Sequence, residues 1–176
     1  MTSGLVFDTT APTHFARAGR LDLLQAMTSG YERSAPTEVL DEAQRGVLEH
    51  PAIGNLFGAK WLKIVELDIF ATIRAATFKG ELGGGPLQHL GECATLALAQ
   101  SRGAAAVIDD RDGRRIGKRH SIEVTGSLSL VARAVRVGTI DLDAAAEMVD
   151  NLVATDMYLP TDGPGFEPWA RSRGLL

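Results

Sequence analysis

Residues 104–126 read Ala-Ala-Ala-Val-Ile-Asp-Asp-Arg-Asp-Gly-Arg-Arg-Ile-Gly-Lys-Arg-His-Ser-Ile-Glu-Val-Thr-Gly, and this stretch decides the fold that we expect. Its short apolar run, Ala104 to Ile108, ends abruptly in Asp109 and Asp110. A buried strand that delivers acids to the carboxyl edge of a parallel sheet has this pattern. The residues that follow are expected to form a turn, a short basic helix and the next strand: residues 111–113, Arg114 to His120, and Ile122 to Thr125. The stretch therefore predicts a strand–helix–strand unit with acidic residues at its functional end.

Length and composition limit the classes of protein to consider. A chain of 176 residues predicts one domain, residues 1–176, in which residues 160–176 form a Gly/Pro-rich C-terminal extension. The formal net charge of −4 argues against a generally basic nucleic-acid coat, although it leaves room for a local basic patch. Cys93 is the only cysteine, which excludes a disulfide framework and a thiolate metal site. Residues 1–8 lack the pattern of a signal peptide, and no apolar run approaches the ~20 residues of a membrane span, so we expect a cytoplasmic protein without membrane contact.

Short apolar runs alternate with amphipathic stretches along the rest of the chain. Further strands are expected at Leu5 to Phe7, Tyr31 to Ala35 and Trp61 to Leu67. Helices are expected over residues 11–18, 21–27, 38–48, 69–78, 92–100, 127–137 and 141–158, with a short helix or turn over residues 169–176. This alternation predicts an α/β fold in three layers, with a mostly parallel central sheet flanked by helices.

Acidic side chains from four separate segments are expected to meet at one edge of this sheet. Asp8 follows the first strand, and Asp109 and Asp110 follow the strand of the central stretch. Glu92 begins the helix that leads into that strand, and Glu42 lies on a helix after the second strand. Ligands of parallel sheets bind at the carboxyl ends of the strands, and clustered carboxylates are tolerated mainly around a cation. An all-oxygen set of ligands suits Mg²⁺ or Mn²⁺, and the usual work of such a site is phosphodiester chemistry.

Each acid also has a purely structural explanation, which stays open at this point. Asp8 is suited to cap the next helix, and Glu92 to interact favourably with a helix dipole. Glu42 is as consistent with a solvated helix face as with a ligand, and Glu38 or Asp41 is able to substitute for it. The two adjacent acids of the central stretch also suit a turn, but their position at the end of an apolar strand favours function.

A basic helix beside the acids is expected to bind the phosphates of RNA. Its candidate contacts are Arg111, Arg114, Arg115, Lys118 and Arg119. In a helix, Arg114 lies one turn from Lys118 and Arg115 one turn from Arg119, so two basic rows would flank the metal edge. The alternative for such a run of charges is a solvated face.

Several segments, taken in order, resemble the PIN-domain family, in particular the bacterial PIN-like proteins related to VapC-type toxins. The matching segments span nearly the whole chain: Val6 to Thr10, Ala18 to Leu24, Pro36 to Glu42, Gly91-Glu92 with its alanine-rich helix, Ile108 to Arg115, and Val124 to Gly126. The resemblance implies a parallel sheet flanked by helices and a metal-dependent endoribonuclease, the toxin of a toxin–antitoxin system, that uses Mg²⁺ or Mn²⁺. It also implies RNA as substrate and a cognate antitoxin as partner, and it allows a homodimer.

The site residues of that family carry over onto this sequence one by one. Asp8 matches the first acid, where this branch often has asparagine, and Thr10 matches a hydroxyl that helps to hold water or metal. Glu42 matches the second acid, and Glu92 stands where aspartate is common, which lengthens its reach by one methylene. The fourth acidic position of the family matches the pair Asp109-Asp110, and the sequence does not indicate which of the two residues is the equivalent one. The resemblance thus implies these catalytic residues, of which all except Glu42 are metal ligands: Asp8, Glu42, Glu92, Asp109 and Asp110.

Two other functions stay open. A catalytically silent PIN-like module that binds RNA or a partner would have the same fold with incomplete metal binding. Asp8-Thr9-Thr10 after a strand also suits an aspartyl phosphatase of the haloacid-dehalogenase type, but that class requires a second acid at position 10, which is threonine. The triple glycine of residues 83–85 lacks the lysine and the following Ser or Thr of a P-loop, so we interpret it as a linker.

Overall fold

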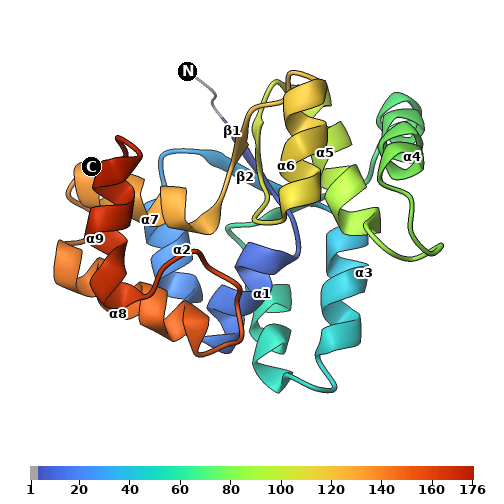
Figure 1. The fold of residues 1–176 in the computed structure, drawn as a ribbon. Helices are drawn as coiled ribbons and strands as arrows, with labels where there is room; N and C mark the ends of the chain where they lie inside the picture. Colours follow the sequence, from blue (N-terminus) through green and yellow to red (C-terminus); the bar gives the residue numbers. More distant parts are fainter. Residues whose placement is uncertain (1–3) are drawn as a thin grey trace.

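A five-stranded parallel sheet forms the centre of the computed structural model, which describes residues 4–176 (Figure 1). The strands are β1 (Gly4–Phe7), β2 (Glu32–Pro36), β3 (Lys63–Val65), β4 (Ala105–Val107) and β5 (Val124–Thr125). Their order in the sheet is β3-β2-β1-β4-β5, and every neighbouring pair runs parallel. β2 and β3 therefore extend the sheet on one side of β1, and β4 and β5 extend it on the other side. This reversal of strand order lies between β1 and β4, where parallel sheets open a crevice for ligands.

Helices cover both faces of the sheet, which gives the three-layer α/β fold that the sequence predicts. The helices are α1 (Thr10–Arg17), α2 (Leu21–Met27), α3 (Thr37–Gly46), the 3-10 helix η1 (Pro51–Gly58), α4 (Ile69–Leu82), α5 (Leu90–Arg102), α6 (Arg111–Arg119), α7 (Ser127–Arg136), α8 (Leu142–Val153) and α9 (Gly163–Ser172). Leu5 and Phe7 of β1 face one core with side chains of α1, α2, α3, η1, α7, α8 and α9. Val6 faces the opposite core with side chains of α4, α5 and α6. Because side chains of a strand alternate between faces, one short apolar strand contributes to both cores.

The C-terminal segment packs into the same core as β1. Asp162 caps α9, since its Oδ1 accepts a hydrogen bond from Gly165 N at 2.9 Å. Phe166 and Ala170 of α9 are fully buried, and Figure 1 shows α9 beside α8. The expected short helix or turn at residues 169–176 is therefore a longer helix that begins earlier, at Gly163.

Two predicted element boundaries are wrong for local reasons. The turn expected at residues 111–113 is the first turn of α6, because Asp110 Oδ1 accepts hydrogen bonds from Asp112 N at 2.7 Å and Gly113 N at 3.3 Å. The helix expected to reach Tyr158 ends at Val153, and Asp156 adopts a positive φ of 62° beyond it. Within residues 4–176, no helix is long and apolar enough to cross a membrane.

Candidate functional site

Acidic side chains gather at the carboxyl ends of β1 and β4, where the strand order reverses. Asp8 directly follows β1, and its backbone N–H donates to Val107 O of β4 at 3.1 Å. Asp109 and Asp110 follow β4 after one buried residue, Ile108. Glu92 lies in the first turn of α5, which is fixed to β1 because Thr95 Oγ1 donates to Phe7 O at 3.2 Å. The fold thus delivers acids from three segments to one crevice.

Two neighbouring threonines connect the first acid to the second. Thr10 Oγ1 donates a hydrogen bond to Asp8 Oδ2 at 3.2 Å, and Thr9 Oγ1 donates to Glu42 Oε2 at 2.9 Å. A Cβ on Gly91 would lie only 2.5 Å from Glu42 Oε2, so the absence of a side chain there lets α5 approach this pair. Glu42, rather than Glu38, is the glutamate whose charge acts on Asp8. Thr9 was not among the predicted site residues, although Thr9 directly follows Asp8 in the sequence.

Asp8 is a buried acid whose neutral form is favoured by its surroundings. Its side chain is 6% exposed. Burial raises the pKa of the Asp8 carboxyl from 3.8 to about 6, and the negative charge of Glu42 adds to this effect. Hydrogen bonds from Thr10 oppose the rise. Without a cation, ionised Asp8 is therefore unfavourable in this crevice.

Glu92 is the second buried acid of the crevice. His89 Nδ1 lies 3.0 Å from Glu92 Oε2, whereas Glu92 Oε1 is buried without a hydrogen-bond partner. Burial, together with the negative charges of Asp8 and Asp110, raises the pKa of Glu92 to about 7. A Cβ on Gly113 would lie only 1.8 Å from Glu92 Oε1, so the first turn of α6 closes over this oxygen. His89 was not among the predicted site residues, and its spacing of three residues from Glu92 is the signal that indicates the contact.

The two adjacent aspartates after β4 make different contacts. Asp109 Oδ1 accepts a hydrogen bond from Ser127 N at 2.9 Å, and Asp109 Oδ2 accepts one from Ser127 Oγ at 2.6 Å. Both Asp109 oxygens thus hold the start of α7, and Arg114 lies 4.0 Å from the same carboxylate. Asp110 caps α6 through Oδ1 alone, and its charge acts on Glu92. The structure therefore brings Asp110, and not Asp109, into electrostatic contact with the other acids.

The donor chemistry of this crevice fits a divalent cation. Asp8, Glu92 and Asp110 repel one another, one Glu92 oxygen lacks a partner, and all donors are oxygen atoms. Among residues 4–176, no three His, Cys, Asp or Glu side chains stand close enough together to hold a metal ion as placed. The acids are thus within electrostatic reach of one another rather than at the distances of a finished coordination sphere.

The basic residues of α6 divide into two groups. Arg111 and Arg114 line a groove of about 800 Å³, hereafter the main groove, together with Thr10, Asp109 and Asp110. Arg115 instead pairs with Asp112 at 2.9 Å, and Arg119 pairs with Glu81 of α4 at 2.8 Å. Arg115, Lys118 and Arg119 are absent from the lining of the main groove in the part of the chain that the structure describes. The two predicted basic rows therefore do not both face the acids.

The opposite wall of the main groove comes from the C-terminal part of the chain. It is lined by residues 157–160, by Trp169 of α9 and by Arg173, which directly follows α9. These residues were not among the predicted site residues. They lie about 50 residues beyond the acids of the central stretch, and no local sequence pattern links the C-terminal residues to those acids.

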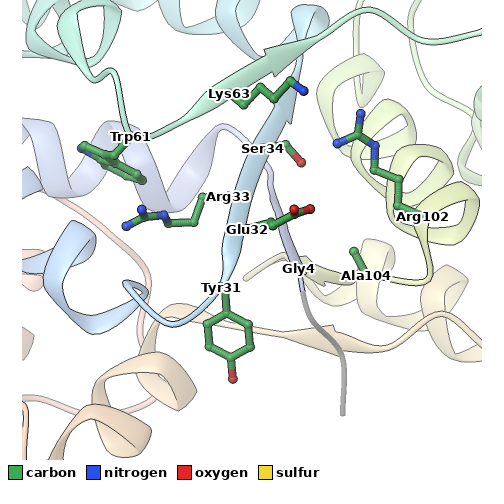
Figure 2. A pocket seen from close by; sticks show the side chains of 9 residues that line it. All are labelled: Gly4, Tyr31, Glu32, Arg33, Ser34, Trp61, Lys63, Arg102 and Ala104. Atoms are coloured by element: carbon green, nitrogen blue, oxygen red, sulfur yellow. The ribbon is translucent and has the colours of Figure 1, made fainter.

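A second cavity, of about 300 Å³, lies at the other edge of the sheet (Figure 2). Its lining residues include Gly4, Lys63 and Ala104, which stand at or next to the amino ends of β1, β3 and β4. Figure 2 shows Arg33 pointing toward Trp61, and the guanidinium carbon lies 5.4 Å from the ring centroid. This cavity is remote from the acids, which all lie at the carboxyl edge.

Comparisons with known proteins agree with this architecture. A family model described as a PIN domain matches residues 4–163. A solved structure of VapBC2 from Rickettsia felis, bound to a DNA fragment from its promoter, contains a similar chain with a TM-score of 0.51 and 15% sequence identity. That match covers 69% of this chain and 97% of the other, and at this identity it establishes the fold alone. No curated protein matches the sequence.

Proposed function

The chain belongs to the PIN-domain family, whose model spans residues 4–163, and from this premise we propose that it is a metal-dependent endoribonuclease of the toxin type. PIN domains are generally nucleases. The observation that carries the proposal is the group of mutually repelling acids, Asp8, Glu92 and Asp110, at the point where the strand order reverses. Burial raises the pKa values of Asp8 and Glu92, so their charged forms are unfavourable in the isolated fold and would be favoured by a divalent cation in the crevice.

We propose that Asp8, Glu92 and Asp110 hold Mg²⁺ or Mn²⁺ after rotation of their side chains. A bound cation of this kind activates water toward the phosphorus atom and stabilises the leaving oxygen of an RNA phosphodiester. Thr10 holds the Asp8 carboxylate in place, and Thr9 holds Glu42 beside it. Asp109 is a positioning residue, because it fixes the start of α7 at the rim of the crevice.

RNA would approach along the main groove. Arg111 and Arg114 line this groove next to Asp110, so their guanidinium groups are placed to bind the phosphates on either side of the cleaved one. Arg111 forms no ion pair or hydrogen bond among the described residues, which leaves its charge available.

Binding of Mn²⁺ and cleavage of RNA test this proposal together. Asp8→Asn removes one charged ligand, so we expect at least a tenfold loss of Mn²⁺ affinity in calorimetry and loss of cleavage of a mixed RNA panel. Asp112→Asn is the matched control, because Asp112 is an exposed acid of α6 that pairs with Arg115. Equal Mn²⁺ affinity in wild type and Asp8→Asn would refute the site, and cleavage that persists in EDTA would refute the mechanism.

The second candidate is a catalytically silent PIN-like module that binds RNA or a partner. It is favoured by the absence, among residues 4–176, of three potential ligands at metal-binding distance. RNA binding without Mn²⁺ binding and without cleavage is the result that this alternative predicts.

We also propose a cognate antitoxin and a homodimer as partners. An apolar surface for such contacts is available on α4, where Ile69, Phe70 and Ile73 are more than half exposed. Purification from the native host as a monodisperse monomer without a bound small protein would contradict this part of the proposal.

A further inference from the structure

The outer wall of the main groove lies partly beyond the segment that the family model matches. That match ends at residue 163, whereas Trp169 of α9 and Arg173, which directly follows α9, lie beyond it. The inner wall holds Asp110 and Arg111. One side of the main groove therefore contains acids within the matched segment, and the other side includes residues that lie beyond the segment that the family model matches.

Tyr158 presents an aromatic ring to this groove from an anchored backbone. Its side chain is 93% exposed, so core packing does not explain it. The preceding residue, Met157, is buried and its N–H donates to Leu152 O at 3.3 Å. A ring on a fixed backbone loses little conformational entropy when another flat group stacks on it.

The α9 part of the wall adds a second aromatic ring and a cation. The rings of Trp169 and Phe166 stack with their centroids 6.3 Å apart, and the Arg173 guanidinium lies 4.7 Å from the centre of the Trp169 ring. Arg173 has no acidic partner among the described residues, as is also true of Arg111 across the groove. Aromatic rings interleaved with unpaired cations are typical of surfaces that bind single-stranded nucleic acid.

From this wall we infer that the main groove binds single-stranded RNA, with one unpaired base stacked on Tyr158 and a neighbouring phosphate at Arg173. The inference deepens the proposed nuclease function and rests on it, because the groove leads to Asp110. Bases in a duplex already stack on one another, so Tyr158 would select unpaired segments over paired ones.

Binding without metal tests this inference separately from catalysis. The chain has two tryptophans, so Trp61→Phe leaves Trp169 as the only tryptophan reporter, and Trp61 lies at the opposite edge of the sheet. In EDTA, we expect a single-stranded RNA of 12 nucleotides to quench Trp169 fluorescence, and the same RNA paired in a duplex to bind more weakly. Tyr158→Ala in this background should weaken single-strand binding by about fivefold or more, the loss that corresponds to one stacked base.

The matched control is Phe57→Ala, which removes a partly exposed aromatic side chain of η1 that does not line the main groove. We expect its RNA affinity to equal that of the parent. An RNA of the same length without bases should bind the parent and Tyr158→Ala equally, because no base remains to stack.

Three results would overturn the inference: equal affinity for duplex and single strand, equal affinity of Tyr158→Ala and Phe57→Ala, or Tyr158-dependent binding of an acidic, apolar peptide in place of RNA. If any of these occurs while Mn²⁺-dependent cleavage of RNA persists, the stacking site is wrong and the nuclease function stands. If RNA is neither bound nor cleaved, both proposals fail.

Discussion

At the scale of single residues, the adjacent Asp109 and Asp110 show how one step along the chain changes the role of an acid. Asp109 uses both oxygens to accept hydrogen bonds from Ser127, which is fully buried at the start of α7. Asp110 caps α6 through one oxygen and acts electrostatically on Glu92. The sequence left open which of the two is a ligand. The contacts of Ser127 give Asp109 a structural role, and we propose Asp110 as the metal ligand.

Two variants separate these roles. Asp109→Ala leaves the N–H and hydroxyl of Ser127 without acceptors, so we expect a loss of about 1–3 kcal/mol in the free energy of unfolding. Asp110→Asn retains a good helix cap, so its unfolding free energy should change by less than about 0.5 kcal/mol while Mn²⁺ affinity falls. Urea denaturation and calorimetry of both variants give the two readouts. The assignment is wrong if Asp109→Ala loses Mn²⁺ affinity at unchanged stability.

At the scale of elements, α6 is a basic helix whose cations serve different purposes. Its N-terminal end contributes Arg111 and Arg114 to the main groove. Its C-terminal end is attached to α4, since Arg119 Nη1 donates to Glu81 Oε2 at 2.8 Å and His120 Nε2 lies 2.6 Å from Glu81 Oε1. The Arg119 and His120 groups hold the pKa of the Glu81 carboxyl below its ordinary value. One end of this helix thus lines the main groove, and the other end packs against α4.

The salt dependence of RNA binding distinguishes the two ends of α6. Each arginine that contacts a phosphate contributes roughly one unit to the salt slope, so Arg111→Ala with Arg114→Ala should reduce the slope by about two units. Arg115→Ala with Arg119→Ala removes the same charge but leaves the groove intact, and we expect an unchanged slope. Affinities at three or more salt concentrations provide the measurement. If only the Arg115→Ala, Arg119→Ala variant had a reduced salt slope, the RNA would bind the other face of α6.

For the molecule as a whole, the buried Asp8 and the partly buried His14 make the free energy of unfolding depend on pH in opposite directions. Burial raises the pKa of Asp8 from 3.8 to about 6, so between these values the folded chain holds a proton that the unfolded chain releases. The contribution of Asp8 to the free energy of unfolding therefore falls as pH rises through this range. Burial lowers the pKa of His14 from 6.5 to about 4, so the contribution of His14 rises with pH over a similar range.

Comparison with a variant isolates the contribution of Asp8 from that of His14. Without metal, we expect Asp8→Asn to gain stability relative to wild type as pH rises from 4 to 7, by roughly 3 kcal/mol in all. Saturating Mn²⁺ should reverse the difference above pH 6, because the cation stabilises the ionised wild-type carboxylate. Denaturant unfolding at four pH values measures both effects. A difference that is independent of pH would show that Asp8 is not held in its neutral form.

The strands and the acids that follow them could be predicted from the sequence, because they depend on residues close together in the chain. Apolar runs such as Leu5 to Phe7 and Ala104 to Ile108 predicted the buried parallel strands, and the acids directly after them predicted the functional edge. The strands and the position of these acids are confirmed, because burial and strand direction place the residue after a strand at the carboxyl edge whatever the rest of the chain does. That this edge carries the function stays a prediction.

The contacts between segments far apart in the sequence could be read from the tertiary structure alone. The contact of Thr9 with Glu42, the attachment of Arg119 to Glu81, and the wall with Tyr158 opposite Arg111 all join residues more than 30 positions apart. An amphipathic pattern states that a helix such as α9 must bury one face, but it does not state against which neighbour. The packing of α8 and α9 onto the sheet made that choice, and with it the shape of the groove that leads to the acids.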